Sequence, residues 1–181
     1  MLKSDIYEIL FANYLLSMPK PIILFDFSGE SDLQNWTVVN DGVMGGLSKG
    51  NFTLNKEGHA LFKGNISLEN YGGFSSVQYK FESKLIKGFK KLILRLKGDG
   101  KQYQVRVKSR NSDDYSYVAY ITTNGKWQTL EIPLTEMVPW FRGNKLNIPN
   151  YPAEYMEQFA ILIGNKKKEN FELYMDKIVL E

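Results

Sequence analysis

The clearest strand-and-turn pattern in the chain is Lys91-Leu92-Ile93-Leu94-Arg95-Leu96-Lys97-Gly98-Asp99-Gly100-Lys101-Gln102-Tyr103, and it indicates the fold class. Apolar and polar side chains alternate up to residue 97, which is the period of a half-buried β-strand. Asp99-Gly100 then gives a two-residue hairpin signal. The pattern predicts a hairpin whose cross-strand pairs are Leu96 with Tyr103 and Leu94 with Val105 on the core face, and Arg95 with Gln104 on the outer face.

Short apolar or alternating segments continue on both sides of this stretch. A second hairpin signal, Asn124-Gly125, separates residues 115–123 from residues 126–133. Both faces of residues 115–123 carry large side chains, so either face could point inward. Residues 139–150 read as a long connection, and residues 153–157 as a helical turn. About ten short strands with regular turn signals and no repeat predict an all-β fold, a β-sandwich of jelly-roll type.

The N-terminal residues 1–20 predict a short helix that docks on a single β-sandwich domain formed by residues 21–181. The uncharged run of residues 9–18 is too short to span a bilayer. Asp5 and Glu8 stand where a signal peptide carries basic residues, and no small-residue cleavage site precedes Pro19. A processed or membrane-associated segment is the alternative. The chain is therefore expected to have no transmembrane segment and to be cytoplasmic.

Composition excludes several kinds of chemistry. The chain has 181 residues, no Cys, one His and a net charge of +3. Disulfides, thiolate metal sites and cysteine nucleophiles are absent, and no metal-ligand motif can be written around the single His59. An exposed structural role is expected for that histidine. No catalytic residue, metal or cofactor is predicted, and the small net charge does not favour nucleic acid.

A glycine-rich stretch, Asn40-Asp41-Gly42-Val43-Met44-Gly45-Gly46-Leu47-Ser48-Lys49-Gly50, and a second glycine pair before Phe74 stand out as loops. Glycine at this density either turns the chain sharply or lets another group approach the backbone. A bulged hairpin turn without a ligand is the simpler alternative. A phosphate cradle is excluded because no helix with a Walker-type lysine follows.

Asp41 and Asp99 are the carboxylates of interest, since both lie in glycine-flanked turns that a sandwich can bring to one rim. Each can accept backbone N–H groups within its own turn. Alternatively, one of them pairs with Arg95 or Arg142 to fix the rim loops. Calcium ligation is a third option, but the Asp spacing of a dedicated calcium loop is missing.

Basic side chains are frequent between residues 84 and 110, and they include Arg106 and Lys108. A solvated sheet face explains them, and an acidic protein surface or anionic lipid headgroups fit them better than nucleic acid. Aromatic rings in or near loops are candidates for sugar binding, namely Trp140, Tyr71, Tyr115 and Tyr117. Trp36 and Trp127 are expected to pack in the core or at strand ends.

Several separate pieces of the chain form a recognisable pattern that covers residues 25–180. The pieces are Trp36 with Asn40-Asp41-Gly42-Val43-Met44-Gly45-Gly46-Leu47-Ser48, Phe62-Lys63-Gly64, Asn70-Tyr71-Gly72-Gly73-Phe74-Ser75-Ser76, Gly98-Asp99-Gly100-Lys101-Gln102-Tyr103, Trp127 with Ile132-Pro133, Phe141-Arg142-Gly143, and residues 161–164 before Phe171. Together they resemble the family of the thirty-kilodalton complex I intermediate-associated protein, an assembly factor of respiratory NADH:ubiquinone oxidoreductase.

This resemblance implies a galactose-binding-like sandwich and a non-catalytic domain that holds a protein partner, such as a respiratory-complex subunit or an assembly intermediate. Gln78 departs from the basic residue expected after the Gly-Gly-Phe loop, so no anion-binding role is assigned there. The alternative is a carbohydrate-binding module on the same fold. The predicted binding residues are Asp41, Gly45, Gly46, Ser48, Gly72, Gly73, Phe74, Arg95, Asp99, Trp140 and Arg142.

Overall fold

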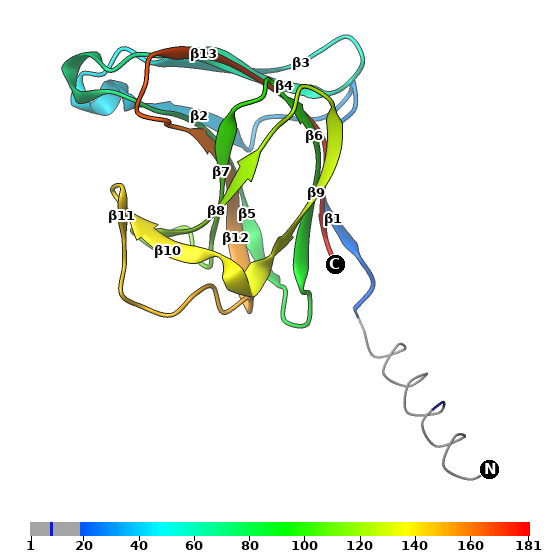
Figure 1. Ribbon diagram of the computed structural model, residues 1–181. Coiled ribbons are helices and arrows are strands. Elements are labelled where there is room, and N and C mark those ends of the chain that lie inside the picture. The colour runs from blue at the N-terminus through cyan, green and yellow to red at the C-terminus, as the bar shows by residue number, and fades with distance from the viewer. Residues whose placement is uncertain (1–7, 9–18) are drawn as a thin grey trace.

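The computed structural model describes residue 8 and residues 19–181. The strands between residues 22 and 180 form two antiparallel sheets packed face to face (Figure 1). The six-stranded sheet has the order β3 (Lys49–Leu54), β4 (Ala60–Ile66), β13 (Glu169–Leu180), β6 (Lys91–Gly98) and β9 (Trp127–Pro133), with β1 (Ile22–Asp26) also paired to β13. The seven-stranded sheet has the order β11 (Asn144–Lys145), β10 (Val138–Phe141), β8 (Ser116–Thr122), β7 (Gln102–Lys108), β12 (Tyr155–Ile163), β5 (Ser75–Leu85) and β2 (Trp36–Asn40). The predicted all-β sandwich is confirmed.

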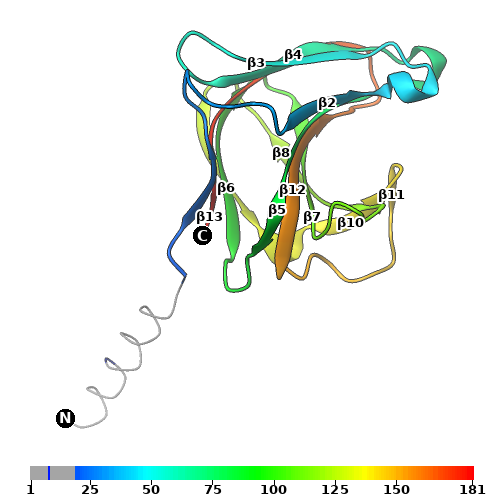
Figure 2. The same cartoon turned by 180° about the vertical axis from the view of Figure 1, so that it is seen from behind.

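Three short 3-10 helices lie in the described connections: η1 (Asp41–Met44), η2 (Glu69–Tyr71) and η3 (Leu134–Glu136). The first two lie side by side at one end of the sandwich, which we call the rim (Figures 1 and 2). The C-terminus and β1 lie away from the rim in both views.

The core lies between the sheets and follows the alternation of the strands. Leu92, Leu94 and Leu96 of β6 are buried, as the pattern predicts. Aromatic rings fill the part of the core that lies against β2 and β5, where Trp36 stacks on its cross-strand partner Tyr79 with ring centroids 4.8 Å apart. Trp36 is thus a core residue, as expected.

The predicted hairpin at Asp99-Gly100 is wrong. β6 pairs with β13 and β9, whereas β7 pairs with β12 and β8, so this turn carries the chain from one sheet to the other. Leu96 and Tyr103 both point into the core, but from opposite sheets. Two strands with alternating apolar residues can either pair within one sheet or face each other across the core from different sheets. The sequence pattern is the same in both arrangements and does not distinguish them.

Asn124-Gly125 does not close a hairpin either, because β8 and β9 also belong to different sheets. The sequence left open which face of β8 points inward. Tyr117 and Ile121 are buried in the core, and Tyr120 is exposed on the outer face. The connection of residues 139–150 contains the β10–β11 hairpin. The helical turn predicted for residues 153–157 is wrong, since β12 begins at Tyr155.

The helix predicted for residues 1–20 falls on residues 1–7 and 9–18, which lie outside the described part of the chain. Within residue 8 and residues 19–181, no helix is both long and apolar enough to cross a membrane.

Candidate functional site

The rim is organised around the carboxylate of Asp41, which is 3% exposed. Its Oδ1 accepts the amide of Ser48 at 3.1 Å, within its own loop. Its Oδ2 accepts the amides of Gly73 at 2.6 Å and of Phe74 at 3.3 Å, in the second glycine loop. We call these four residues the Asp41 clasp, because one side chain joins two loops far apart in the sequence.

The clasp favours the ionised carboxylate. Burial raises the pKa of Asp41, but the hydroxyl and amide of Ser48 and the amides of Gly73 and Phe74 outweigh it, so the pKa lies below its usual value. Donors that point at a carboxylate stabilise its charged form. Asp41 is therefore a fixed negative charge that binds backbone N–H groups. This is the role predicted for it within its own turn, and the structure shows that it also accepts N–H groups from the second loop.

The glycines of both loops make room for this carboxylate. A Cβ on Gly46 would overlap Asp41 Oδ1, and a Cβ on Gly72 would lie 2.6 Å from Oδ2. Gly45 has φ +86° and its carbonyl accepts the side-chain amide of Asn70 at 3.0 Å. The glycines thus allow the chain to turn and let a side chain approach the backbone closely, and the side chain that approaches is that of Asp41.

Exposed apolar side chains lie in the loops that the clasp joins. Leu47 and Leu68 are each 47% exposed, and Tyr71 is 96% exposed. Tyr71 and its neighbour Asn70 have φ of +59° and +53°, a left-handed conformation that is uncommon for a bulky residue. We call Leu47, Leu68 and Tyr71 the rim patch.

Asp99 lies in its own network. It accepts the ammonium of Lys101 at 2.6 Å, the hydroxyl of Tyr103 at 2.9 Å and the amide of Glu172 at 2.9 Å. Burial raises the pKa of Asp99, but these donors outweigh it and lower the pKa. Asp99 thus fixes the crossing turn to β13, and neither predicted arginine takes part.

Arg95 lies on the outer face of the six-stranded sheet, away from the loops with which it was grouped. Its Nε is 2.9 Å from Oδ2 of Asp176, a residue at a register shift in β13, and its guanidinium lies over the ring of Trp127. His59 is half-buried in the same cluster, with Nε2 3.6 Å from Asp176 Oδ1. Among the described residues, no group of three or more His, Cys, Asp or Glu side chains is arranged to hold a metal.

Arg142 forms the turn of the β10–β11 hairpin. Arg142 and Gly143 have φ of +47° and +80°, as a two-residue hairpin of the primed type requires. The Arg142 side chain is exposed and lies over its neighbour Phe141. Gly143 lines a cleft on the sheet face, whereas Arg142 is not among the residues that line it.

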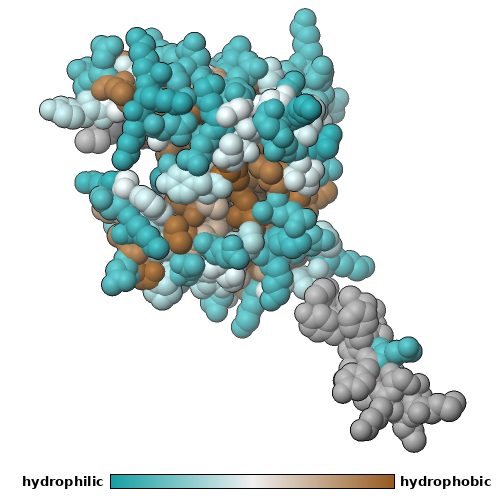
Figure 3. Space-filling model, in the orientation of Figure 1, coloured by the Kyte–Doolittle hydropathy of each residue, from teal (hydrophilic) through white to brown (hydrophobic). Residues whose placement is uncertain are grey.

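The second site is a cleft of about 710 Å³ on the outer face of the seven-stranded sheet. It runs between the β10–β11 hairpin and the turn after β12, and it appears as the notch at the left of Figure 3. We call it the basic cleft, because the lining contains basic, amide and aromatic side chains and, within the described chain, no carboxylate. It is lined by Gly100, Lys101, Gln102, Gln104, Arg106, Tyr120, Thr122, Trp140, Gly143, Gly164, Asn165, Lys166 and Lys167.

The rings of Tyr120 and Trp140 lie edge to face in this cleft, with centroids 6.3 Å apart. Of the other aromatic candidates, Tyr71 is on the rim, Tyr115 is half-buried and Tyr117 is a core residue. Tyr117 is therefore excluded from any surface role, which its place on the inward face of β8 explains.

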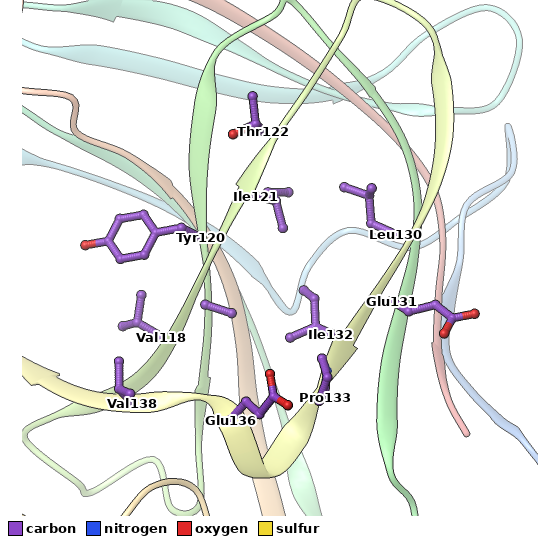
Figure 4. Close-up of a pocket in the computed structure, with 11 residues that line it drawn as sticks. Val118, Tyr120, Ile121, Thr122, Leu130, Glu131, Ile132, Pro133, Glu136 and Val138 are labelled. Atoms are coloured by element: carbon purple, nitrogen blue, oxygen red, sulfur yellow. The ribbon is translucent and has the colours of Figure 1, made fainter.

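A third hollow of about 520 Å³ opens where β8 and β9 face each other across the edge of the sandwich. Figure 4 shows Ile121, Leu130 and Ile132 pointing into this gap, and the same region is brown in Figure 3. Ile121 and Ile132 are only 7% and 5% exposed. These side chains belong to the core, so the hollow offers little apolar surface to a ligand.

The family described as Complex I intermediate-associated protein 30 (CIA30) matches residues 25–175. The chain belongs to the CIA30 family. The matched segment contains the Asp41 clasp, the rim patch and the basic cleft, and the predicted resemblance is confirmed.

Two named relatives carry the family's description. The mitochondrial complex I intermediate-associated protein 30 of Drosophila melanogaster is 24% identical over 187 residues, which cover 88% of this chain and 62% of that protein. The Mus musculus protein of the same name is 26% identical over 141 residues, or 66% of this chain and 43% of that protein. The chain thus spans less than two thirds of either relative.

A solved structure resembles the fold. It is a family 11 carbohydrate-binding module from Clostridium thermocellum in complex with a β-1,3-1,4-mixed-linked tetrasaccharide, and it aligns with a TM-score of 0.64 and 18% identity. The alignment covers 88% of this chain and 94% of the module. At this identity the likeness concerns the fold alone, and it agrees with the jelly-roll sandwich that was expected.

Sequence reasoning missed the central residues of the basic cleft, Gln104, Arg106 and Tyr120. The strand alternation already placed Gln104 and Arg106 on an outer face, but the mistaken hairpin put that face beside Arg95. Tyr120 was missed because the inward face of its strand was left open. Prediction of the cleft would have required knowing that β6 and β7 belong to different sheets.

Proposed function

We propose that this chain is a non-catalytic protein-binding domain that associates with an assembly intermediate of complex I, and that it holds its partner through the rim patch. The family membership supports the kind of partner. The observation that carries the location is Tyr71, whose ring is almost wholly exposed on a backbone held in a left-handed conformation. Strained backbone and exposed aromatic rings are both frequent at binding sites.

The clasp supports the same proposal through preorganisation. Because Asp41 and the Asn70–Gly45 hydrogen bond tie η1 to η2, the rim patch is rigid before a partner arrives. A rigid patch loses less conformational entropy on binding. In this proposal Asp41, Gly45, Gly46, Ser48, Gly72, Gly73 and Phe74 position the contact surface, and Leu47, Leu68 and Tyr71 touch the partner.

Affinity capture from the native host tests this. We expect the Leu47→Asn, Tyr71→Ser double variant to recover complex I subunits roughly tenfold less well than the wild type, because truncated interface anchors usually weaken binding by that much or more. Leu85→Asn is the matched control, since Leu85 is 62% exposed at the other end of β5. Equal recovery by the double variant contradicts the rim assignment, and recovery of no complex I subunit by the wild type contradicts the partner.

A second function, carbohydrate binding, is favoured by one specific observation: Tyr120 and Trp140 lie with amide side chains in a cleft on the sheet face. The structural neighbour bound to a tetrasaccharide has the same fold. Calorimetric screening of oligosaccharides tests this candidate, with saturable binding expected for the wild type. Loss on Tyr120→Ala or Trp140→Ala supports the cleft, and binding unchanged in both variants contradicts it.

A further inference from the structure

Arg106 is an unusual feature of the basic cleft. It lies on the outer face of β7, half-buried, and both Nε and Nη2 donate to Oε1 of Gln104 at 3.0 and 2.6 Å. Among the described residues no carboxylate lies within ion-pair distance of its guanidinium. A cation withdrawn in part from water is usually paired with an anion, and the acceptor that the described residues give this guanidinium is a neutral amide, so Arg106 is suited to an anion from outside.

Positive charge continues from Arg106 along the same face. Lys80 and Lys108 lie opposite each other on the two sides of Gln158, because both are in register with it across β12. The ammonium of Lys108 donates to the carbonyl of Asp113 at 2.6 Å. Burial lowers the pKa of Lys108, as do Lys80 and Arg106, while Asp113 and Asp114 raise it. Lys80 is exposed and Lys108 is half-buried, and both lie outside the cleft lining, so they extend the positive charge of this sheet face beyond the cleft.

The floor of the cleft limits what the ligand can be. β7 is paired on both sides, with β12 and with β8, so no strand edge is open to an extended peptide there. Recognition must come from side chains. Those that line the cleft include the amides of Gln102, Gln104 and Asn165, the rings of Tyr120 and Trp140, the ammonium groups of the lining lysines and the Arg106 guanidinium. Amides suit hydroxyl groups, an amphipathic ring suits a sugar face, and a guanidinium suits a carboxylate.

We propose that the basic cleft binds an acidic oligosaccharide, with the carboxylate of a uronic acid residue on Arg106 and a sugar ring against Tyr120. This inference rests on the carbohydrate-binding function proposed above and specifies its substrate class. The volume of about 710 Å³ lies within the usual range of ligand sites and leaves room for more than one sugar unit.

Isothermal titration calorimetry on the full chain tests the inference, with three sets of probes. The first set is hexamers of galacturonate, guluronate and glucuronate, the second is neutral galactan and mixed-linked glucan hexamers, and the third is a hexaglutamate peptide. We expect saturable binding of at least one uronate hexamer, weakened by added salt. Neutral hexamers of the same length should bind at least about tenfold more weakly.

Three variants make the test specific. Arg106→Gln is expected to weaken uronate binding at least about tenfold, and Arg106→Lys less, because it keeps the charge and loses the planar fork. Arg110→Gln, an exposed arginine outside the cleft lining, is the matched control and should change binding less than about twofold. Thermal unfolding checks each fold, and Tyr120→Ala serves as a second cleft variant if Arg106→Gln does not fold.

The outcomes separate this inference from the function on which it rests. Neutral hexamers that bind as tightly as uronates overturn the acidic substrate and leave carbohydrate binding standing. Hexaglutamate binding without any oligosaccharide overturns both in favour of a peptide site, and no binding by any probe also overturns both. Uronate binding unaffected by Arg106→Gln overturns the assigned role of Arg106.

Discussion

Asp41→Asn is expected to lower the free energy of unfolding by roughly 2–4 kcal/mol, because the amides of Ser48, Gly73 and Phe74 lose a charged acceptor in a buried place. Urea unfolding followed by tryptophan fluorescence measures the change. Asp32→Asn is the control, since Asp32 is an exposed carboxylate whose hydrogen bonds stay within its own turn. An Asp41→Asn protein as stable as the wild type would show that the clasp does not hold the loops.

The same carboxylate predicts a dependence of stability on pH. The folded-state pKa values of Asp41 and Asp99 lie below the ordinary value of 3.8, so the unfolded chain takes up protons first as the pH falls. Their contribution is therefore complete above about pH 5 and is lost as the pH falls through the folded-state values. Unfolding free energies measured between pH 7 and pH 2.5 should decline below about pH 4, and less steeply in Asp41→Asn. An equal decline in both proteins would assign the effect to other carboxylates.

At the scale of the loop, Gly46→Ala is expected to destabilise by about 1–3 kcal/mol, because the added methyl overlaps the Asp41 carboxylate. Gly42→Ala is the matched control four residues earlier: its Cβ would meet nothing within 4 Å and its backbone is not left-handed. Thermal unfolding of both variants measures the difference. If Gly42→Ala were the more damaging change, the glycines would be needed for chain flexibility instead of close approach.

The strands show what sequence can and cannot predict at the scale of elements. Alternation identified the inward face of β6 correctly, because the side-chain period of one strand is enough to predict which of its residues are buried. It failed for strand pairing at Asp99-Gly100 and Asn124-Gly125, because a strand's partners are chosen by the whole sandwich. The β10–β11 hairpin was missed because it is short, although Arg142-Gly143 marks its turn.

The candidate site was predictable to a similar degree. Glycine density and family resemblance pointed to Asp41 and its loop, since close approach leaves a local mark in the sequence. The basic cleft was not predicted, because Arg106, Tyr120 and Trp140 meet only through the pairing of β7, β8 and β10. Arg95 was wrongly grouped for the same reason.

For the whole molecule, the rim patch and the basic cleft involve separate residues, so their functions should be separable. We expect Leu47→Asn, Tyr71→Ser to leave uronate affinity within about twofold, and Arg106→Gln to leave partner recovery unchanged, because distant sites without shared contacts act additively. Calorimetry and affinity capture on both variants measure this. Loss of both activities in either variant would mean that one surface serves both ligands.

The chain repeatedly passes between the two sheets, as at Asp99-Gly100 and Asn124-Gly125, and this has a consequence for dynamics. Each sheet is assembled from segments spread along the chain, so neither can open while the other keeps all its connections. Native-state amide hydrogen exchange should therefore find the central strands β6 and β7 equally protected, although they lie in different sheets. Because the polypeptide chain crosses between the two sheets several times, we expect the sandwich to unfold as a single cooperative unit.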